Sequence, residues 1–289
     1  MLKGTIREFK DDNLTDLAAA LTYYGVLAIF PIIVIVSVLG LIGNSVTQPL
    51  IKNLGQRRAG SGPPDLHQRD PERSVGQGHG RDPVRGRLAG ALWSASGYVA
   101  AFIRASNAVW DIEEGRPIWK TLPIRLGVTL FTVVLLTVSA AVVVFTGGLA
   151  KQVGGLIGLG SSAVTVFDIA KWPVLLLIVS LILAVLYYAS PNVKQPGIRW
   201  VSPGSVFAVL AWLAVSALFA LYVASFASYN KTYGALGGVV AFLVWPWLTN
   251  VVILLGAELN AELERGRQIQ AGHPPQQEPY LPPRNDPGD

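Results

Sequence analysis

The chain contains no cysteine and is poor in charged residues. The absence of cysteine from its 289 residues excludes disulfides, a thiolate nucleophile and cysteine-ligated zinc or iron–sulfur sites. Charged residues make up 14% of the chain and hydrophobic residues 51%, whereas soluble domains carry about 25% charged residues. The mean hydropathy is +0.44. These proportions predict an all-α, polytopic membrane protein whose first partner is the lipid bilayer.

Histidine is scarce as well, and its positions do not favour catalysis. The three histidines, His67, His79 and His273, fall in a polar loop and in the C-terminal tail. Metal-dependent hydrolysis needs clustered His, Asp or Glu side chains. The chain has neither a zinc-protease motif nor a nucleotide-binding glycine motif. We therefore expect no catalytic, cofactor-binding or metal site, and we do not expect an enzyme.

Six apolar segments have the length, or nearly the length, of a membrane-spanning helix. Spanning a bilayer takes about 20 mostly apolar residues. The predicted spans are residues 26–42, 88–105, 126–150, 172–189, 203–227 and 235–257. The sixth has 23 residues without a charge, whereas the second has only 16 before Arg104. We predict a six-transmembrane-helix bundle over residues 26–264.

The segments that flank this bundle have a different composition. Residues 1–25 place leucine and alanine at helical spacing among charged residues, which predicts an amphipathic helix on the cytoplasmic interface. Residues 265–289 are polar and rich in proline, and we expect a disordered cytoplasmic tail. Six spans place both flanks on the same side of the membrane.

The distribution of Lys and Arg decides the orientation only if one loop is set aside. The side that carries both termini has 12 of these residues and the other side has 11, of which 8 lie in residues 47–87. Without that loop the count is 12 against 3, which places both termini in the cytoplasm. We therefore predict a multi-pass plasma-membrane protein. The net charge of +5 then reflects cytoplasmic loops, and we expect no nucleic-acid partner.

Residues 56–87 are unusual for a loop of a membrane protein. They are crowded with Arg, Gly, Pro, Asp and Gln, and a disordered linker is the simplest interpretation. We favour a frameshift. The segment GRDPVRGR (residues 80–87) can be encoded so that loss of one nucleotide changes it to AGILFVVG, which would lengthen the second span. One shift, in the gene or in its sequencing, would explain both the short span and the misplaced positive charge.

Candidate functional side chains lie at the end of the second span and in and just after the sixth. Polar groups inside a bilayer are costly unless another helix or a water-filled path covers them. The candidates are Arg104, Asn107, Trp245, Pro246, Trp247, Asn250, Glu258 and Glu262. Each is compatible with helix packing and with a position along a substrate path. Packing is the favoured interpretation for each residue within the sixth span taken alone. Arg104 is expected to reach the cytoplasmic interface, or else to form an ion pair that lines a cytoplasmic mouth.

Some of these residues carry sharper expectations. Asn250 lies mid-membrane and is expected either to form an interhelical hydrogen bond or to contact substrate. Pro246, between two tryptophans, is expected to bend the sixth helix. Glu258 and Glu262 are four residues apart on one helical face. They face water, or a cation or an Arg lies between them.

Four blocks of sequence stand out in order along the chain. They are AAALTYYGVLAIFP (residues 18–31), SASGYVAAFIRASNAVWD (94–111), YYASPN (187–192) and YGALGGVVAFLVWPWLTNVVILLGAELNAEL (233–263). Together they resemble the YihY/BrkB family of bacterial inner-membrane proteins. The resemblance implies six spans; one member is named a virulence factor, and members have carried the label ribonuclease BN. Family sequences lack an Arg/Gly/Pro-rich insert after the first span, which supports the frameshift.

Two hypotheses about function follow. The first is a transporter or lipid-moving protein whose substrate is a small molecule or a lipid, with the sixth helix, Arg104 and Asn107 near the path. The second is a non-transporting scaffold that binds partners or lipids. A homo-oligomer is compatible with both. A ribonuclease is disfavoured because the sequence has no cluster of metal ligands.

Overall fold

Helices dominate the computed structural model, which describes residues 2–38, 83–144, 161–197, 202–226, 230–276 and 278–286. The helices within these residues are α1 (Leu2–Asp11), α2 (Leu14–Val38), α4 (Pro83–Val109), α5 (Ile118–Val144), α7 (Ser161–Ala189), α8 (Pro203–Phe226) and α9 (Asn230–Gln270). In these ranges the only β-type pairing is an isolated bridge between Val193 and Pro283. The prediction of an all-α protein is therefore confirmed for the part of the chain that the structure describes.

Five of these helices are long and apolar enough to cross a membrane. The candidate spans are Leu14–Ile33, Ile118–Val143, Thr165–Ala189, Pro203–Ser225 and Gly237–Gln270, in α2, α5, α7, α8 and α9. The prediction of a multi-pass membrane protein is thus confirmed. The predicted second span corresponds to α4, which is not among the five. Its 27 residues are rich in glycine, alanine and serine and include arginines at positions 85, 87 and 104, so its apolar character is low.

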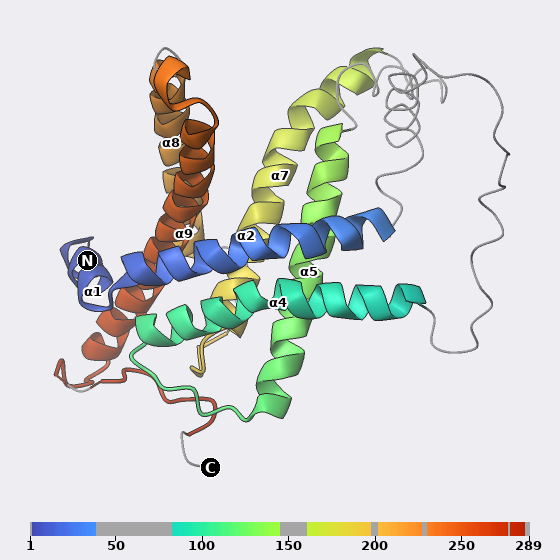
Figure 1. The fold of residues 1–289 in the computed structure, drawn as a ribbon. Coiled ribbons are helices and arrows are strands. Elements are labelled where there is room, and N and C mark those ends of the chain that lie inside the picture. Colours follow the sequence, from blue (N-terminus) through green and yellow to red (C-terminus); the bar gives the residue numbers. More distant parts are fainter. Residues whose placement is uncertain are drawn as a thin grey trace, which may run out of the picture.

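Six of the described helices form three pairs. α2 lies beside α4, α5 beside α7, and α8 beside α9, and each pair is in contact. Figure 1 shows the α2–α4 pair running across the other two pairs, with the upper ends of α8 and α9 apart from those of α5 and α7. The N-terminal helix α1 packs on α9 near the end of α9 that carries the tail.

Local sequence signals explain where several helices begin and end. Asn13 adopts a positive φ of 51°, which separates α1 from α2 and which asparagine tolerates better than most residues. The predicted amphipathic segment 1–25 is therefore α1 and the first half of α2. Ser202 caps α8, because its hydroxyl accepts a hydrogen bond from the amide of Ser205 and the Ser205 hydroxyl accepts one from the amide of Ser202. Pro203 follows at the first helical position, where no amide donor is needed.

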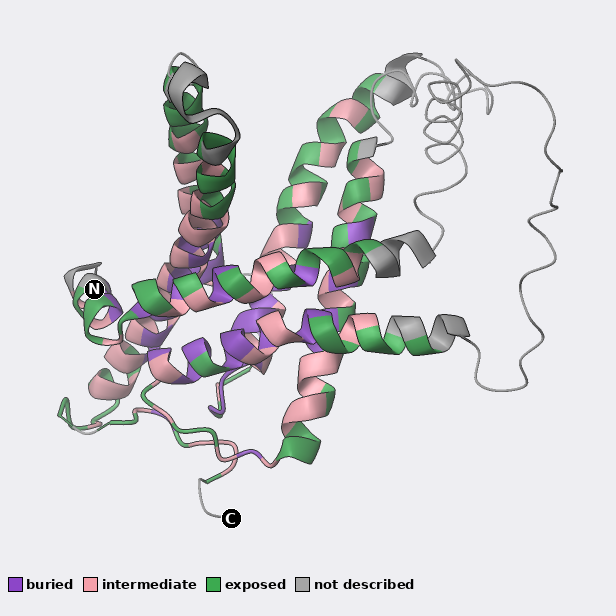
Figure 2. Cartoon of the chain, in the orientation of Figure 1, coloured by how far each residue is buried: buried purple, intermediate pink, exposed green. Residues whose placement is uncertain are grey.

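The buried core lies where all the helices converge. Phe102, Leu14, Leu21 and Leu254 are the largest fully buried apolar side chains, and they come from α2, α4 and α9. Figure 2 shows the buried residues concentrated in this region, with exposed residues along the outer parts of α5, α7, α8 and α9. Those outer parts present Leu, Val, Phe and Trp side chains outward, as a surface in contact with lipid requires.

Several predicted boundaries differ from the observed ones. Helix α9, which contains the sixth predicted span, continues to Gln270, well beyond the predicted end of that span at residue 257. Its charged final turns contain two ion pairs, of Arg265 with Glu262 and of Arg267 with Glu264, at the three-residue spacing that stabilises a helix. α5 and α7 begin at Ile118 and Ser161, before the predicted spans.

The unusual segment at residues 56–87 falls largely outside the described part of the chain. Only its last residues, Pro83 to Arg87, are described, as the first turn of α4. The frameshift stays a prediction. Parts of the predicted first, third and fifth spans, at residues 39–42, 145–150 and 227, also lie outside the described residues.

Candidate functional site

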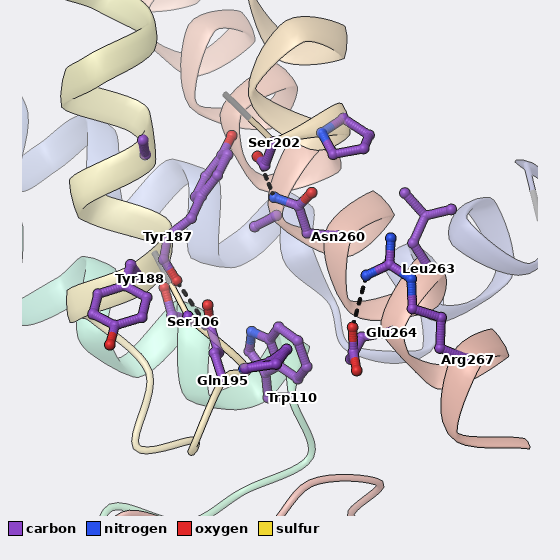
Figure 3. A pocket seen from close by; sticks show the side chains of 15 residues that line it. Ser106, Trp110, Tyr187, Tyr188, Gln195, Ser202, Asn260, Leu263, Glu264 and Arg267 are labelled. Carbon is purple, nitrogen blue, oxygen red and sulfur yellow. Dashed lines mark hydrogen bonds and ion pairs between the residues drawn. The ribbon is translucent and has the colours of Figure 1, made fainter. Parts of the chain in front are cut away.

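A pocket lies where α4, α7, α8 and α9 converge, at the end of the molecule that carries the C-terminal tail (Figure 3). Its volume is about 70 Å³. Polar and aromatic side chains dominate its wall. The lining residues are Ser106, Trp110, Ala184, Tyr187, Tyr188, Gln195, Pro196, Gly197, Ser202, Pro203, Ala257, Asn260, Leu263, Glu264 and Arg267.

Asn260 fixes one wall of the pocket by joining α9 to the start of α8. Its side-chain oxygen accepts a hydrogen bond of 2.9 Å from the amide of Gly204, and its side-chain nitrogen donates one of 3.0 Å to the Ser202 hydroxyl. The helices can come this close because neither Gly204 nor Gly256 has a side chain. A Cβ atom at Gly204 would collide with the backbone oxygen of Gly256, and one at Gly256 would collide with that of Gly204. These contacts hold the two helices together beside the pocket.

A charged pair lies further along the same face of α9, at the right of Figure 3. Arg267 donates a hydrogen bond of 2.9 Å to Glu264 within an ion pair, and Gln268 donates another of 3.0 Å to the same carboxylate. The Glu264 side chain is 9% exposed and the Arg267 side chain 46%. The pocket therefore presents a carboxylate and a partly exposed guanidinium three residues apart on one helix.

The aromatic wall comes from α7 and from the turn that follows α4. Tyr187 is buried, and its hydroxyl donates a hydrogen bond of 2.7 Å to the carbonyl oxygen of Ile253 in α9. Gln195 donates a hydrogen bond of 2.9 Å to the Tyr187 carbonyl oxygen, which holds the α7–α8 connection against α7. Trp110 and Tyr188 complete the wall.

Behind the pocket, a polar network joins the α4–α5 loop to the α7–α8 connection. Arg116 is buried and forms an ion pair with Glu114 at 2.7 Å, and it also donates to the carbonyl oxygen of Ser190 at 2.6 Å. Asn107 donates to Glu114 at 3.0 Å and accepts from the amide of Asn192 at 2.8 Å. Burial alone would raise the pKa of Glu114, but the hydrogen bonds from Arg116 and Asn107 outweigh it and hold that pKa below its usual value.

The C-terminal tail packs against this network, in contrast to the expected disorder. Arg284 donates hydrogen bonds to the carbonyl oxygens of Val193 at 2.8 Å and Tyr188 at 2.7 Å, and its guanidinium lies over the Tyr188 ring. The Asn192 side chain donates to the carbonyl oxygen of Asn285 and accepts from its amide. The physical reason for the order is these hydrogen bonds between side chains and backbone groups, which a polar composition does not reveal.

The structure places the candidate residues of the sixth helix in packing contacts. Asn250 accepts a hydrogen bond of 2.9 Å from the Tyr98 hydroxyl and donates one of 3.0 Å to the Thr22 hydroxyl. Trp247 donates to the carbonyl oxygen of Thr15, and Trp245 packs edge-on against Trp212 in α8. Pro246 lies within α9, which continues as one helix on both sides of it.

The remaining candidates also lie outside the pocket. Arg104 is exposed, donates to the carbonyl oxygen of Ala100 and lies over the ring of Tyr24, and Asn107 belongs to the network described above. Glu262 accepts a hydrogen bond of 3.1 Å from Arg265, and Glu258 is buried. The structure brings none of the eight candidates into the pocket wall.

The residues that do line the pocket left a weak signal in the sequence. Asn260, Leu263, Glu264 and Arg267 recur at helical spacing and continue one face of the sixth helix past its apolar run. Tyr187 and Tyr188 belong to the YYASPN block. The sequence does not show that this block lines a pocket, because the other walls come from distant segments. Among the described residues, no group of three or more His, Cys, Asp or Glu side chains could hold a metal ion.

The fold defines the class as a multi-pass α-helical membrane protein. The sequence profile of the virulence factor BrkB family matches residues 5–280, and the chain belongs to that family. The expected family membership is therefore confirmed.

Individual relatives cover different parts of the chain. It is 33% identical over 190 residues to a ribonuclease-like protein, YfkH, of Bacillus subtilis strain 168, a match that covers 66% of this chain and 67% of that protein. It is 42% identical over 83 residues to a UPF0761 membrane protein of Azotobacter vinelandii, and 32% identical over 170 residues to one of Aromatoleum aromaticum. Those two matches cover 29% and 57% of this chain, and only 20% and 40% of the relatives. No solved structure matches the chain.

Proposed function

We propose that the protein spans the plasma membrane six times, with α4 as the additional span and both termini in the cytoplasm. At 1.5 Å per residue, the 27 residues of α4 extend over about 40 Å, more than the roughly 30 Å of a hydrocarbon core. α2 packs along α4, with the Tyr24 ring beside Gly97. With residues 47–87 set aside, the side that carries the tail has 12 Lys and Arg residues and the other side has 3, which supports the cytoplasmic orientation.

Single-cysteine labelling tests this topology, because the natural chain has no cysteine that would react. Gln56→Cys lies between α2 and α4 in the sequence, and Glu113→Cys is exposed just after α4. A membrane-impermeant maleimide should label Gln56→Cys in intact cells and Glu113→Cys only after permeabilisation. Labelling of both positions from the same side would show that α4 does not cross.

We further propose that the protein binds an amphiphile with a zwitterionic headgroup at the pocket and moves it across the membrane. The observation that carries this proposal is the placement of Glu264 and Arg267 together on the pocket wall. A guanidinium is suited to a phosphate, and a carboxylate is suited to an ammonium group. Trp110 and Tyr188 supply the aromatic surfaces that favour the interfacial layer of a bilayer.

The position of the pocket within the protein supports the same function. Its walls are the ends of α4, α7 and α9 and the start of α8, so it lies where the apolar spans meet the polar loops. Headgroups occupy this level of a bilayer, while the exposed apolar side chains of the same helices would lie among acyl chains. The protein would act on its substrate by binding and displacement, without catalysis.

Lipid binding to the purified protein tests the pocket. Native mass spectrometry should show a zwitterionic aminophospholipid bound to the wild type, with reduced occupancy in Glu264→Gln and Arg267→Gln. Arg104→Gln is the matched control, because Arg104 is also exposed on a helix but lies outside the pocket. Equal occupancy in all four proteins would contradict the assignment of the pocket.

A non-transporting scaffold is the second candidate function, and one observation favours it. The side chains of Asn250 and Asn107 use both their oxygen and their nitrogen in internal hydrogen bonds, so they are occupied by packing. Such a scaffold would bind partners or lipids, or a second copy of the chain, through its exposed helix faces. Crosslinking that recovers one stoichiometric partner, together with no lipid movement by the purified protein, would favour this alternative over transport.

A further inference from the structure

Glu258 is a buried acid that the pocket does not use. It lies in α9 with 2% of its surface exposed, and it is among the largest fully buried side chains of the described residues. Its Oε2 atom has no hydrogen-bond partner there. A carboxylate in such a position is unfavourable unless a cation or donors compensate its charge.

The helices around Glu258 bring further acids and little compensation. Asp12 in the α1–α2 turn, Glu262 in α9, Glu8 in α1 and Asp111 after α4 all lie within electrostatic range of it. α8, which also packs on α9, contains no Asp, Glu, Lys or Arg. On α2, Asp16 is exposed, as is Arg104 on α4. Four separate parts of the chain thus surround Glu258 with negative charge.

The cation that faces this cluster is Arg265, and its charge is already shared. Arg265 forms ion pairs with Glu8 at 2.9 Å, Glu262 at 3.1 Å and Glu278 of the tail at 3.6 Å. Arg7, on the same helix as Glu8, pairs with Glu8 at 2.8 Å and is exposed. Neither arginine forms an ion pair with Glu258 within the described residues.

We propose that Glu258 is a proton-binding site, occupied by a proton in the resting protein. A proton is the cation that this geometry accommodates, because the described acids do not form a metal site. When bound to Glu258, it removes the buried charge. When it leaves, the O–H bond on Glu258 breaks, the electron pair stays on the carboxylate, and the proton passes to water on the side of Asp12 and Asp111.

The acids nearest to water are suited to this exchange. Burial, together with Asp111 and Glu8, raises the pKa of Asp12 to about 7. Burial, together with Glu278 and Glu8, raises the pKa of Asp111 to about 6. Both groups therefore titrate near neutral pH. Asp12 is half-buried and Asp111 is exposed, so they lie between the buried Glu258 and water. The site is independent of the proposed lipid pocket, because Glu258 is not part of its wall.

Carbodiimide labelling tests the proton site directly. Dicyclohexylcarbodiimide is an apolar reagent that modifies protonated carboxyl groups in membrane proteins. Mass spectrometry of the labelled wild-type protein in detergent at neutral pH should find the adduct on Glu258. Labelling should fall about tenfold for each pH unit once the carboxyl group loses its proton. It should disappear in Glu258→Gln and persist in Glu262→Gln, the matched control on the same face of α9.

A second measurement tests whether Glu258→Gln loses the adduct because it is misfolded. Glutamine has nearly the shape of protonated glutamate and, like it, is uncharged, so Glu258→Gln should keep the wild-type elution volume and a melting temperature at least as high at pH 8. Absence of the adduct from Glu258 at every pH in folded wild-type protein would overturn the proposal. So would labelling that does not change with pH, or a lower melting temperature of Glu258→Gln at pH 8.

Discussion

The hydroxyl of Tyr98 donates a hydrogen bond of 2.9 Å to the side-chain oxygen of Asn250, which joins α4 to α9. The nitrogen of the same amide donates to Thr22 in α2, so one side chain links three helices. Thr22 in turn donates to the carbonyl oxygen of Ala18 within its own helix. This contact ties the α2–α4 pair to the sixth predicted span, and its removal should loosen both.

Asn250→Leu should destabilise the protein by about 1–2 kcal/mol, because it removes two interhelical hydrogen bonds and leaves the partly buried Tyr98 hydroxyl unpaired. Tyr98→Phe removes only one of them and should cost roughly half as much. Unfolding in mixed detergent micelles measures both changes. Tyr23→Phe is the control, since the Tyr23 side chain is 62% exposed. An Asn250→Leu protein as stable as the wild type would show that the contact does not hold the helices together.

Gly256→Ala should lower stability by about 1–3 kcal/mol, because the added methyl group would collide with the backbone of Gly204 and the hydroxyl of Tyr187. Gly127→Ala adds the same group on α5, where nothing lies within 4 Å, and should leave stability unchanged or slightly raised. The melting temperatures of the two variants, measured in one detergent, give the comparison. Equal melting temperatures would rule out the close approach of α8 and α9.

Arg284→Ala should release the C-terminal tail, because it removes two hydrogen bonds to backbone carbonyl oxygens and the contact with the Tyr188 ring. Limited proteolysis should then cut residues 271–286 several-fold faster than in the wild type, with a stability loss of about 1–3 kcal/mol. Lys194→Ala changes an exposed side chain beside the same contact and is the control. If both variants resist the protease as well as the wild type, Arg284 does not anchor the tail.

Stability should decrease between pH 5 and pH 8. The pKa of Asp12 is raised to about 7 and that of Asp111 to about 6, so between their ordinary values near 4 and these values the folded state binds more protons than the unfolded state. Folding is therefore progressively disfavoured as the pH rises through this window. The lowered pKa values of Glu8 and Glu114 act in the opposite direction, but only at more acidic pH.

Melting temperatures at pH 5 and pH 8 measure this dependence. Asp12→Asn should reduce the difference between the two, because the amide cannot lose a proton. Asp16→Asn, at an exposed position on α2, should retain the wild-type difference. A wild-type melting temperature that rises with pH across this window would contradict the electrostatic account of the α1–α2 turn.

The sequence predicts the membrane class and most helices, because long apolar runs such as residues 235–257 have no other stable environment. It also identifies Asn250 as a residue that needs a partner. Its partners are Thr22 and Tyr98, which lie 228 and 152 residues away, and no local pattern connects them.

The pocket and the ordered tail could not be predicted either, because both depend on contacts between residues far apart in the sequence. Asn260 and Glu264 share a helical face, which the sequence shows, but the tyrosines opposite them come from a helix some 70 residues earlier. The tail is polar and rich in proline, and composition alone predicts disorder. It packs because Asn192 and Arg284, 92 positions apart, satisfy backbone groups on each other's segments.

The most direct test of the central claim is the rate at which the reconstituted protein moves a fluorescent zwitterionic phospholipid across liposomes. The wild type should move it several-fold faster than empty liposomes do. Glu264→Gln and Arg267→Gln should lose most of this gain, and Arg104→Gln should keep it. A wild-type rate equal to that of empty liposomes, with folded protein correctly inserted, would contradict the proposed function.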